Sequence, residues 1–497
     1  MSGKRVLFAI VVMLSVQYAA EYAVGQSPPP AFEPGTLIIG YKSQADRQQA
    51  EQEFKAAKDA VNVRGERAEN VQFEPVGNSA LKLRLELPVR MRGRANDDPK
   101  VELQLLQETA KQIKESDNRV KYAHPNWILN ANPVPPRVPI DVRALDEIVL
   151  PTTAGPAVPN DYAFVRGLHW HYAALPMGMN AIGAWKTETG SKDVVVAVVD
   201  TGILLDHPDI QGSGNVLPGY NFVSKTGRSA DPTDPGDACP QKGQNHSSWH
   251  GTHVAGTIGA VGSNNGRGIT GINWSVSVLP VRVLGSCGGS FSDIADGVRW
   301  AAGLPVAGAP NNAHPAHIIN LSLGGSVPCT EEQAGLLVSA LDDARAAGSI
   351  VVAAAGNDQQ DIKGASPAGC KGVISVAASD KEGHLAWYSN FGNVTIMAPG
   401  GDTRNKDETG FQPGIWSAVQ VSSINREGIE PDQGTSMAAP HVSGALALAL
   451  SRHPDWRGKP DLIVKKLGDS AVAPTSGACR EPCGLGQLDA ARLVESH

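Results

Sequence analysis

The sequence lacks the features that would indicate a nucleic-acid-binding, membrane-spanning or repetitive protein. Its 43 basic and 50 acidic residues leave a net charge of only −7, which gives no reason to expect nucleic acid or a membrane surface as a partner. Neither an internal repeat nor a coiled-coil pattern is found, and no apolar run is long enough to span a bilayer. The 497 residues therefore predict a globular protein of two or three domains, at ~100–200 residues per domain.

The N-terminus has the composition of a secretory signal peptide. Lys4 and Arg5 precede an apolar run over residues 6–16, and small residues follow at 23–25. This order of basic, apolar and small residues is typical of a signal peptide, and the run is too short for a transmembrane helix. A buried N-terminal strand or helix is the alternative. We predict a signal peptide over residues 1–25 and cleavage after Gly25.

Residues 26–135 contain no cysteine and are rich in Gln, Lys, Arg and Glu. We expect strands at 36–41, 80–87 and 120–129, with the second half-exposed because apolar and charged residues alternate in it. A helix is expected near 45–60. Another should begin at Asp98-Pro99, where Asp is a favoured N-cap and Pro a favoured first residue, and run to about 115. Together these elements predict a small α+β domain, followed by a Pro-rich segment at 136–159 that is extended and open to proteolysis.

From residue 160 to 497, short Val/Ile/Ala runs alternate with helical stretches. The runs at 194–199, 278–284, 318–323, 350–355 and 373–378 are typical of strands buried on both faces of a parallel sheet. Helices are expected at 291–302 and 331–347, the latter with a capping box at Thr330 and Gln333 and with Gly348 at its end. We therefore predict an α/β fold with a doubly wound, mostly parallel sheet, preceded by the small α+β domain.

Three segments in this region carry chemically active side chains. Asp200 ends a buried strand in VVAVVDTGI, His250 and His253 lie in SSWHGTHVAGTIGA, and Ser436 lies in GTSMAAPHVSGALALAL. Active sites in open α/β sheets gather beyond the C-terminal ends of the strands, where Asp200 falls. Ser436 follows a glycine where a helix begins, so free N–H groups and positive partial charge lie beside it.

Each segment also has a simpler explanation when read alone. Asp200 could form a turn, and Ser436 or its neighbour Thr435 could only cap the helix. The histidines, with His246, form an H-x3-H-x2-H cluster that could bind metal, although the HExxH pattern is absent. The order Asp, His, Ser, with gaps of 50 and 186 residues, is the order of the subtilisin triad.

Taken together, DTG, HGTHVAGT and GTSMAAPHV resemble the three signature motifs of the subtilisin-like serine peptidases, over about residues 160–495. The resemblance implies a catalytic triad of Asp200, His250 and Ser436, with His253 structural. AAAGND at 353–358 resembles the family's oxyanion segment, which makes Asn357 a side-chain donor and the Ser436 N–H a second donor. A turn after a strand is the alternative for that segment.

The resemblance also implies where a substrate binds. Ser322, Leu323 and Gly324 match the strand that pairs with the substrate backbone, and Gly288 and Gly289 match the opposing strand. Two ordinary glycine-rich loops are the alternative. Glycine allows another backbone to approach closely, and such pairing is β-augmentation. No acidic residue is evident at the pocket floor, so we expect broad specificity.

A structural calcium ion is the one cofactor that the resemblance implies. Asp209 matches a ligand of the family, and Asn265 falls at a side-chain ligand position of a loop of matching length. Ser263, Arg267 and Ile269 would contribute backbone carbonyls. Calcium prefers such mixed oxygen sets. The loop departs from the family pattern at Gly266-Arg267, and an ordinary surface loop is the alternative.

The cysteines fit an exported protein, because disulfides persist in oxidising compartments. Six cysteines allow 15 pairings. The nearest-neighbour pairing is our prediction, and a zinc site that includes the last two cysteines is the alternative. The predicted pairs are Cys239–Cys287, Cys329–Cys370 and Cys479–Cys483.

These expectations combine into a secreted serine endopeptidase made as an inactive precursor. Residues 26–135 resemble the family's propeptide and would inhibit the enzyme from within the same chain, and maturation is expected in 131–159. We expect protein or peptide substrates, no organic cofactor, no nucleic acid, no membrane anchor after signal cleavage, and a monomer. A non-catalytic binding protein on the same fold and a metal-dependent hydrolase are the competing hypotheses.

Overall fold

The computed structural model describes residues 30–56, 61–63, 66–88, 91, 98–131, 140–141, 158–211, 215–236, 238–239, 247–259, 266–407, 410–421 and 426–496. The signal-peptide prediction lies outside them, as do most of the Pro-rich segment and the calcium-loop residues Ser263 and Asn265. By its contacts, the chain from Ala31 to His497 is one compact unit.

The main sheet has seven strands in the order β15-β14-β13-β12-β8-β10-β9. Each of these strands pairs in parallel with its neighbours, as the buried Val/Ile/Ala runs predict. The order reverses beside β8, which is the arrangement of a doubly wound sheet. The strands are β8 (Val195–Asp200), β9 (Tyr220–Asn221), β10 (Ser277–Arg282), β12 (Ile318–Leu321), β13 (Ile350–Ala354), β14 (Ile374–Ser379) and β15 (Ile396–Pro399).

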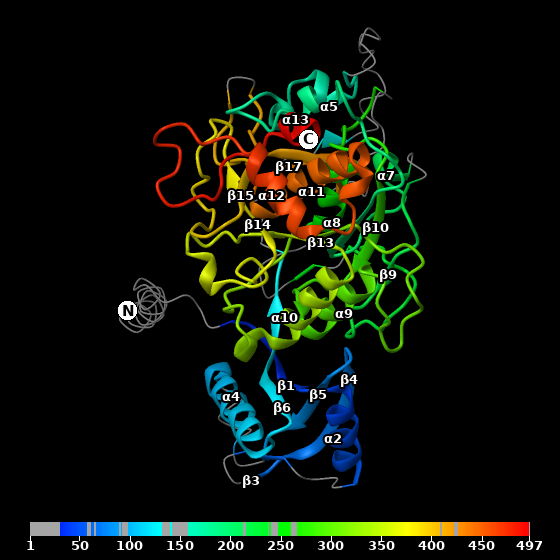
Figure 1. Cartoon of the computed structure of the whole chain (residues 1–497), viewed down its shortest axis with the longest axis vertical. Coiled ribbons are helices and arrows are strands. Elements are labelled where there is room, and N and C mark those ends of the chain that lie inside the picture. The colour runs from blue at the N-terminus through cyan, green and yellow to red at the C-terminus, as the bar shows by residue number, and fades with distance from the viewer. Residues whose placement is uncertain are drawn as a thin grey trace, which may run out of the picture. The chain divides into compact units, whose positions relative to one another are not determined.

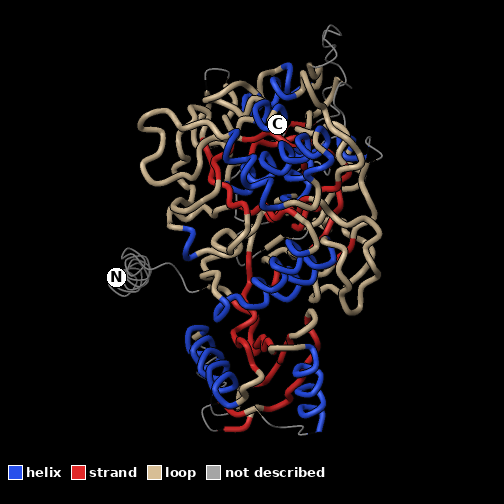
Figure 2. The backbone as a smooth tube through the Cα atoms, in the orientation of Figure 1, coloured by secondary structure: helices blue, strands red, loops and turns tan. Residues whose placement is uncertain are grey.

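Helices cover both faces of this sheet, so its strands are buried on both sides (Figure 2). Val196 and Val198 of β8 pack in one cluster with α8 (His250–Gly259) and α11 (Thr435–Arg452). Their neighbours Val195, Ala197 and Val199 pack with α9 (Phe291–Ala301) and α10 (Glu331–Ala346) in another. Alternate residues of a strand point to opposite faces. The all-apolar run of β8 therefore fills two cores, and α8 lies against α11 on one of them (Figure 1).

The described residues from 140 onward include elements that the sequence did not predict. β16 (Ile415–Val421) and β17 (Arg426–Asp432) form an antiparallel hairpin, and β7 (Ile140–Asp141) pairs with β17. Short helices complete this part: α5 (Tyr162–Val165), α6 (Ala181–Ala184), α7 (Pro208–Gln211), α12 (Pro460–Ser470) and α13 (Ala490–Glu495), with 3-10 turns η3 (Trp170–Tyr172), η5 (Ile362–Gly364) and η6 (Pro454–Trp456). Among the described residues, no helix is both long and apolar enough to cross a bilayer.

Residues 31–131 form the predicted α+β arrangement. A five-stranded sheet has the order β11-β6-β1-β5-β4, and α2 (Gln44–Ala56) and α4 (Pro99–Ser116) pack on it. Asp98 caps α4 by accepting from the N–H of Lys100, as predicted. The strands are β1 (Phe32–Tyr41), β4 (Glu69–Val76), β5 (Ala80–Glu86), β6 (Val120–Leu129) and β11 (Gly289–Ser290), beside a small pair of β2 (Asn62–Val63) and β3 (Glu66–Arg67).

The expectation of a half-exposed strand at 80–87 is wrong for its central lysine. The side chain of Lys82 is only 3% exposed. Its Nζ lies 3.5 Å from Glu33 Oε2 and 3.2 Å from Glu74 Oε1. Its ammonium group is buried because two carboxylates accompany it, which is the condition under which lysine is found inside proteins. An alternating pattern cannot distinguish such a paired lysine from one that faces water.

The elements of residues 31–131 contact α9 and α10 directly. The indole N–H of Trp127 donates to the carbonyl of Gln333 (2.8 Å), and the N–H of Ser292 donates to Asn126 Oδ1 (3.2 Å). His124 is buried between Phe291 of α9 and Leu336 of α10. β6 thus connects the small sheet with two helices of the main domain. These are α9, which follows β11, and α10, which follows the loop that contains Gly324.

Candidate active site

The candidate triad residues lie where elements of the main sheet end or where its helices begin. Asp200 is the last residue of β8, His250 is the first residue of α8, and Ser436 is the second residue of α11. Each is buried, with at most 3% of its surface exposed. The buried strand of the first motif and the small-residue helices of the other two motifs therefore converge at the C-terminal edge of the sheet.

Asp200 and His250 are in direct contact. His250 Nδ1 lies 2.8 Å from Asp200 Oδ1 and 3.0 Å from Asp200 Oδ2. The N–H of Thr201 also donates to Asp200 Oδ1 (2.7 Å). A carboxylate held in this way fixes the imidazole with its proton on Nδ1 and its Nε2 lone pair directed away from the aspartate. Asp200 is therefore a partner of His250 and does not serve only as a turn residue.

Ser436 is not the cap of α11. The N-cap residue is Gly434, which provides no side-chain cap, and the Ser436 hydroxyl donates to the carbonyl of Ser322 (3.1 Å). The Thr435 hydroxyl donates to Asn357 Oδ1 and accepts from the N–H of Gly356. The capping alternative is thus wrong for both hydroxyls. In the first turn, the N–H of Thr435 donates to Asn357 Oδ1, and those of Met437 and Ala438 donate to the carbonyl of Gly434.

Asn357 follows β13 and is held against the start of α11. Its Oδ1 accepts from the N–H and the hydroxyl of Thr435, both at 2.9 Å. These bonds orient the amide so that its Nδ2 group is left as a donor. Gly434 faces this group, and a Cβ there would lie 3.1 Å from Asn357 Nδ2. Gly434 also has φ of +148°, a conformation that side chains rarely adopt.

A segment of the chain itself lies along the predicted substrate strands. Leu129 pairs with Gly289 in β11, and Asn130 forms an antiparallel bridge with Gly324. Both backbone bonds of that bridge form, with distances of 3.1 and 3.0 Å. A Cβ at Gly288 would lie 2.4 Å from the carbonyl oxygen of Leu129, so glycine is required for this approach.

The next residue of this segment, Ala131, lines a pocket with Thr201, Ser247, Leu284 and Gly288. Ser322 and Leu323 are buried, and the Ser322 hydroxyl donates to the carbonyl of Ser436 (2.7 Å). Of the five predicted substrate residues, Gly289 and Gly324 pair with an extended backbone and Gly288 lies close to it. Ser322 instead contacts Ser436, and Leu323 packs in a buried apolar cluster. This segment lies within residues 26–135, which the resemblance to the family's propeptide implies would inhibit the enzyme.

The histidines do not form a metal cluster in the described part of the chain. His253 Nε2 lies 2.9 Å from the carbonyl of Ile415 and 3.2 Å from that of Glu430, and His246 falls outside the described residues. No group of three His, Cys, Asp or Glu side chains among the described residues is arranged to hold a metal ion. His253 anchors the hairpin β16–β17 to α8.

Asp209 has the chemistry of a cation ligand. It is fully buried, and Oδ2 accepts from the N–H of Ile269 (3.2 Å). Among the described residues, Oδ1 has no hydrogen-bond partner, and burial raises the pKa of the carboxyl group to about 7. A buried, partnerless carboxylate oxygen is costly unless a cation satisfies it. Arg267 lies in the loop that carries Ile269, and it is exposed.

The six cysteines form the nearest-neighbour pairs Cys239–Cys287, Cys329–Cys370 and Cys479–Cys483. The zinc alternative for the last pair is therefore wrong. The first disulfide joins the segment before α8 to the loop that leads into β11. The disulfides thus hold segments close to the candidate site and in the C-terminal region.

A parallel α/β sheet with a buried Asp–His pair and a serine at a helix N-terminus is the architecture of a serine hydrolase. A sequence model of the subtilase family matches residues 191–486, and the chain belongs to this family.

The relatives include secreted bacterial proteases. The chain is 40% identical over 351 residues to an extracellular protease of Xanthomonas campestris pv. campestris and 38% identical over 361 residues to an extracellular basic protease of Dichelobacter nodosus. Each match covers 68% of this chain and 56% of the relative. This chain thus spans just over half the length of these relatives.

Solved structures match the same fold. A protease of Pseudoalteromonas arctica PAMC 21717 is 42% identical, with a TM-score of 0.62, and the match covers 68% of this chain and 98% of that one. Fervidolysin of Fervidobacterium pennivorans is 21% identical with a TM-score of 0.62, and the match covers 95% of this chain and 62% of that one. The second likeness shows the fold alone.

Proposed function

We propose that this protein is a secreted serine endopeptidase that hydrolyses peptide bonds with Asp200, His250 and Ser436. The observation that carries the proposal is the contact of His250 Nδ1 with both carboxylate oxygens of Asp200. The Ser436 hydroxyl donates to the carbonyl of Ser322, which follows the strand paired with β8. The names of the relatives support secretion, because both are called extracellular.

In the proposed mechanism, Ser436 Oγ attacks the carbonyl carbon of the scissile bond while His250 Nε2 takes its proton. Asp200 keeps the imidazole in the required tautomer and stabilises the imidazolium. The C–N bond then breaks as His250 gives the proton to the leaving amine, which leaves an acyl group on Ser436. Water attacks this ester by the same route and restores the serine.

The oxyanion of each tetrahedral intermediate would be bound by Asn357 Nδ2 and by the backbone N–H of Ser436. The bonds from Thr435 to Asn357 Oδ1 hold the amide before substrate arrives, so no reorganisation is needed during the reaction. The start of α11 adds positive partial charge at the same point.

Protein substrates would add an extended strand between β11 and Gly324. Residues 128–130 already pair with these edges in this chain, which supports binding by main-chain hydrogen bonds. Ser322, Leu323, Gly288 and Gly289 would border the substrate residues before the cut. Main-chain recognition of this kind fits broad specificity.

The same pairing supports synthesis as an inactive precursor. Residues 26–135 would be the propeptide, because their last described residues fill the edges that a substrate needs. Removal of the signal peptide after Gly25 and cleavage within 131–159 would then leave the catalytic domain, 160–497. The enzyme would act as a monomer without an organic cofactor.

A structural calcium ion would be held by Asp209, whose Oδ1 accepts no hydrogen bond from the residues that the structure describes. Asn265 and the backbone carbonyls of Ser263, Arg267 and Ile269 are the remaining proposed ligands. The ion would neutralise a buried carboxylate and so stabilise this loop. It has no part in the reaction steps.

The proposal is tested by expressing the full chain and its Ser436→Ala variant in a secreting host and following chain size and casein hydrolysis. We expect the wild type to shorten and to cleave casein, and the variant to do neither. A serine-directed phosphonate should label the wild type alone. Full casein hydrolysis by the variant would refute the serine mechanism and favour the metal-dependent hypothesis.

A further inference from the structure

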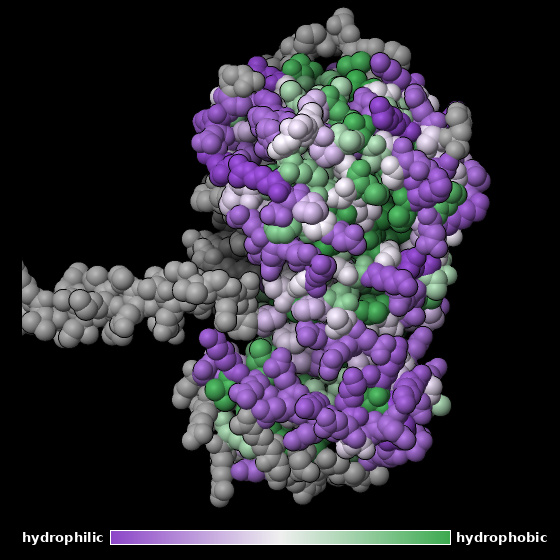
Figure 3. Space-filling view, turned by 60° about the vertical axis from the view of Figure 1, so that its left-hand side comes forward, coloured by the Kyte–Doolittle hydropathy of each residue, from purple (hydrophilic) through white to green (hydrophobic). Residues whose placement is uncertain are grey.

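Trp387 is the one aromatic side chain among the large hydrophobic residues that the described chain leaves clearly exposed. It is 44% exposed. On the face drawn in Figure 3, hydrophobic and hydrophilic residues are intermingled, so isolated exposed apolar side chains are unremarkable in themselves. The full set is Val158, Val165, Met177, Trp387, Val464 and Leu485.

Trp387 does not stand alone, because a cation lies over its ring. The guanidinium carbon of Arg404 is 4.9 Å from the ring centroid. Arg404 Nε donates to Asp402 Oδ1 at 3.0 Å, which fixes the guanidinium over the indole. Arg404 thus acts as a positioning residue for the Trp387 ring.

The two loops that carry these residues border the residues just before Ser436. Thr403 donates from its N–H and its hydroxyl to Gln433 Oε1, at 2.7 and 3.0 Å. The N–H of Gly434 donates to the carbonyl of Gly400 (3.0 Å). The loop with Trp387 also reaches the oxyanion segment, since the N–H of Asn390 donates to Gly356.

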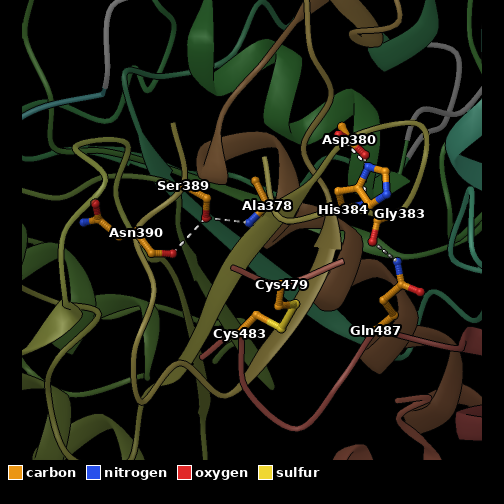
Figure 4. Close-up of a disulfide and its surroundings, with 9 residues drawn as sticks. All are labelled: Ala378, Asp380, Gly383, His384, Ser389, Asn390, Cys479, Cys483 and Gln487. Carbon is orange, nitrogen blue, oxygen red and sulfur yellow. Dashed lines mark hydrogen bonds and ion pairs between the residues drawn. A yellow bond between two sulfur atoms is a disulfide. The ribbon is translucent and has the colours of Figure 1, made fainter. Parts of the chain in front are cut away.

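The loop that carries Trp387 is held by hydrogen bonds to neighbouring segments. Ser389 Oγ accepts from the N–H of Ala378 and donates to the carbonyl of Asn390, and Gln487 Nε2 donates to the carbonyl of Gly383, as Figure 4 shows. The N–H of Leu385 donates to Ala478, next to the disulfide of Cys479. A rigid support of this kind holds an exposed aromatic ring in one place.

The position of Trp387 and Arg404 relative to residues 128–130 indicates which part of a substrate they would contact. Residues 128–130 pair with β11 and with Gly324, where the acyl side of a substrate would lie. None of the contacts described for Trp387 or Arg404 involves those edges. A chain that continues past Ser436 must leave by another side, and the Trp387 loop borders Gly434 and Gly356.

We propose that Trp387, positioned by Arg404, binds an apolar side chain two or three residues beyond the scissile bond and so determines specificity on the leaving-group side. This inference rests on the proposed peptidase function. An apolar side chain would stack on the exposed indole, which offers a large apolar surface at low conformational cost. The surface would not contact the acyl side of the substrate.

The test uses the full chain as processed by a secreting host, with three substrates that share one acyl side. The first is a peptide p-nitroanilide, which has no residue beyond the cut. The other two are internally quenched peptides with leucine or with glycine at the second and third positions after it. Trp387→Ala should lower kcat/KM for the leucine peptide by about 5–10-fold and leave the other two substrates unchanged.

Arg404 variants and a matched surface control complete the design. Arg404→Ala should lose part of the leucine preference and Arg404→Lys should retain it, because lysine can also form the cation–π contact. Leu485→Ala removes an exposed apolar side chain elsewhere (55% exposed) and should change none of the three rates.

Two results would overturn the proposal. One is an unchanged leucine-to-glycine ratio in Trp387→Ala, and the other is an equal loss on all three substrates, which would indicate a general effect on folding or catalysis. Trp387→Phe, which keeps an apolar ring, should retain most of the preference. If the wild type cleaves none of the substrates, the proposed function itself fails.

Discussion

Acid should weaken the packing of residues 31–131 against the rest of the chain, because it protonates a single buried histidine. His124 in β6 is 2% exposed and stacks on Tyr122 at a centroid distance of 5.6 Å. Its Nδ1 lies 2.8 Å from the carbonyl of Pro125, so Nδ1 carries the proton. The Nε2 lone pair then faces the N–H of Leu336 at 3.5 Å.

Protonation would place a second N–H opposite that amide and a charge in an apolar interface. Burial lowers the pKa of His124 to about 4, against about 6.5 for an exposed histidine. Between these values the opened state binds a proton that the closed state does not. The closed state is therefore fully stable above about pH 6.5 and loses stability as the pH falls toward 4.

The magnitude follows from the two pKa values. Linkage gives a loss of about 2 kcal/mol between pH 7 and pH 5, and about 3 kcal/mol by pH 4. The charged groups of α9 and α10 at this interface have other partners, with Ser224, Arg228 and Lys121 among them. These groups are Asp293, Asp296, Arg299, Glu331 and Asp343.

The assay is hydrogen exchange of the β6 amides in the full-length Ser436→Ala chain, corrected for the pH dependence of intrinsic exchange. Burial raises the pKa of Asp293 and of Asp296, which acts in the opposite sense, so a variant without the histidine is required. His124→Gln keeps hydrogen-bonding capacity and cannot titrate. The opening free energy should fall about 2 kcal/mol further for the histidine chain than for the glutamine chain between pH 7 and 5. Equal pH dependence in both would refute the reasoning.

Three further predictions concern the candidate site and its supports. Asn357→Ala should lower kcat by about 10²–10³ with little change in KM, the cost known for the oxyanion donor of subtilisin in this same family; a loss confined to KM would contradict the role. Asp209→Asn should raise the melting temperature in EGTA and abolish the stabilisation by added calcium, because it removes the buried unpaired charge; calorimetry that finds calcium stabilisation intact would exclude this ligand. Replacing both cysteines of Cys329–Cys370 by serine should cost about 4 kcal/mol, against about 2 kcal/mol for Cys479–Cys483, because the first closes a loop of 41 residues and the second a loop of 4; the reverse order in urea unfolding would contradict this.

The buried strands and the position of Asp200 could be predicted because local sequence determines them. A run such as residues 194–199 has one stable environment, a strand covered on both faces, and its end is where an α/β sheet places its chemistry. The cysteine pairs were also predictable here, since each pair joins neighbours along the chain.

The remaining features depend on partners that are distant in sequence. Burial of Lys82 requires Glu33 and Glu74, and no periodicity contains that information. The hairpin β16–β17 was missed because its second strand, REGIEPD, combines charged residues with glycine and proline, which are rare in strands. Its stability comes from packing on His253 and on the cluster of Trp416 and Ile429.

β6 connects the stability of the small sheet with access to the candidate site. One end of the strand pairs with β1, and its other end pairs with β11, so a single strand belongs to both parts of the chain. On the precursor proposal, cutting the linker would leave these hydrogen bonds and the contacts of Trp127 and His124 in place. Onset of activity would then be governed by release of β6. Acid favours this release because it weakens the packing of β6 against the rest of the chain. A chain cut in the linker at neutral pH should therefore remain inhibited, and the His124→Gln variant should remain inhibited in acid as well.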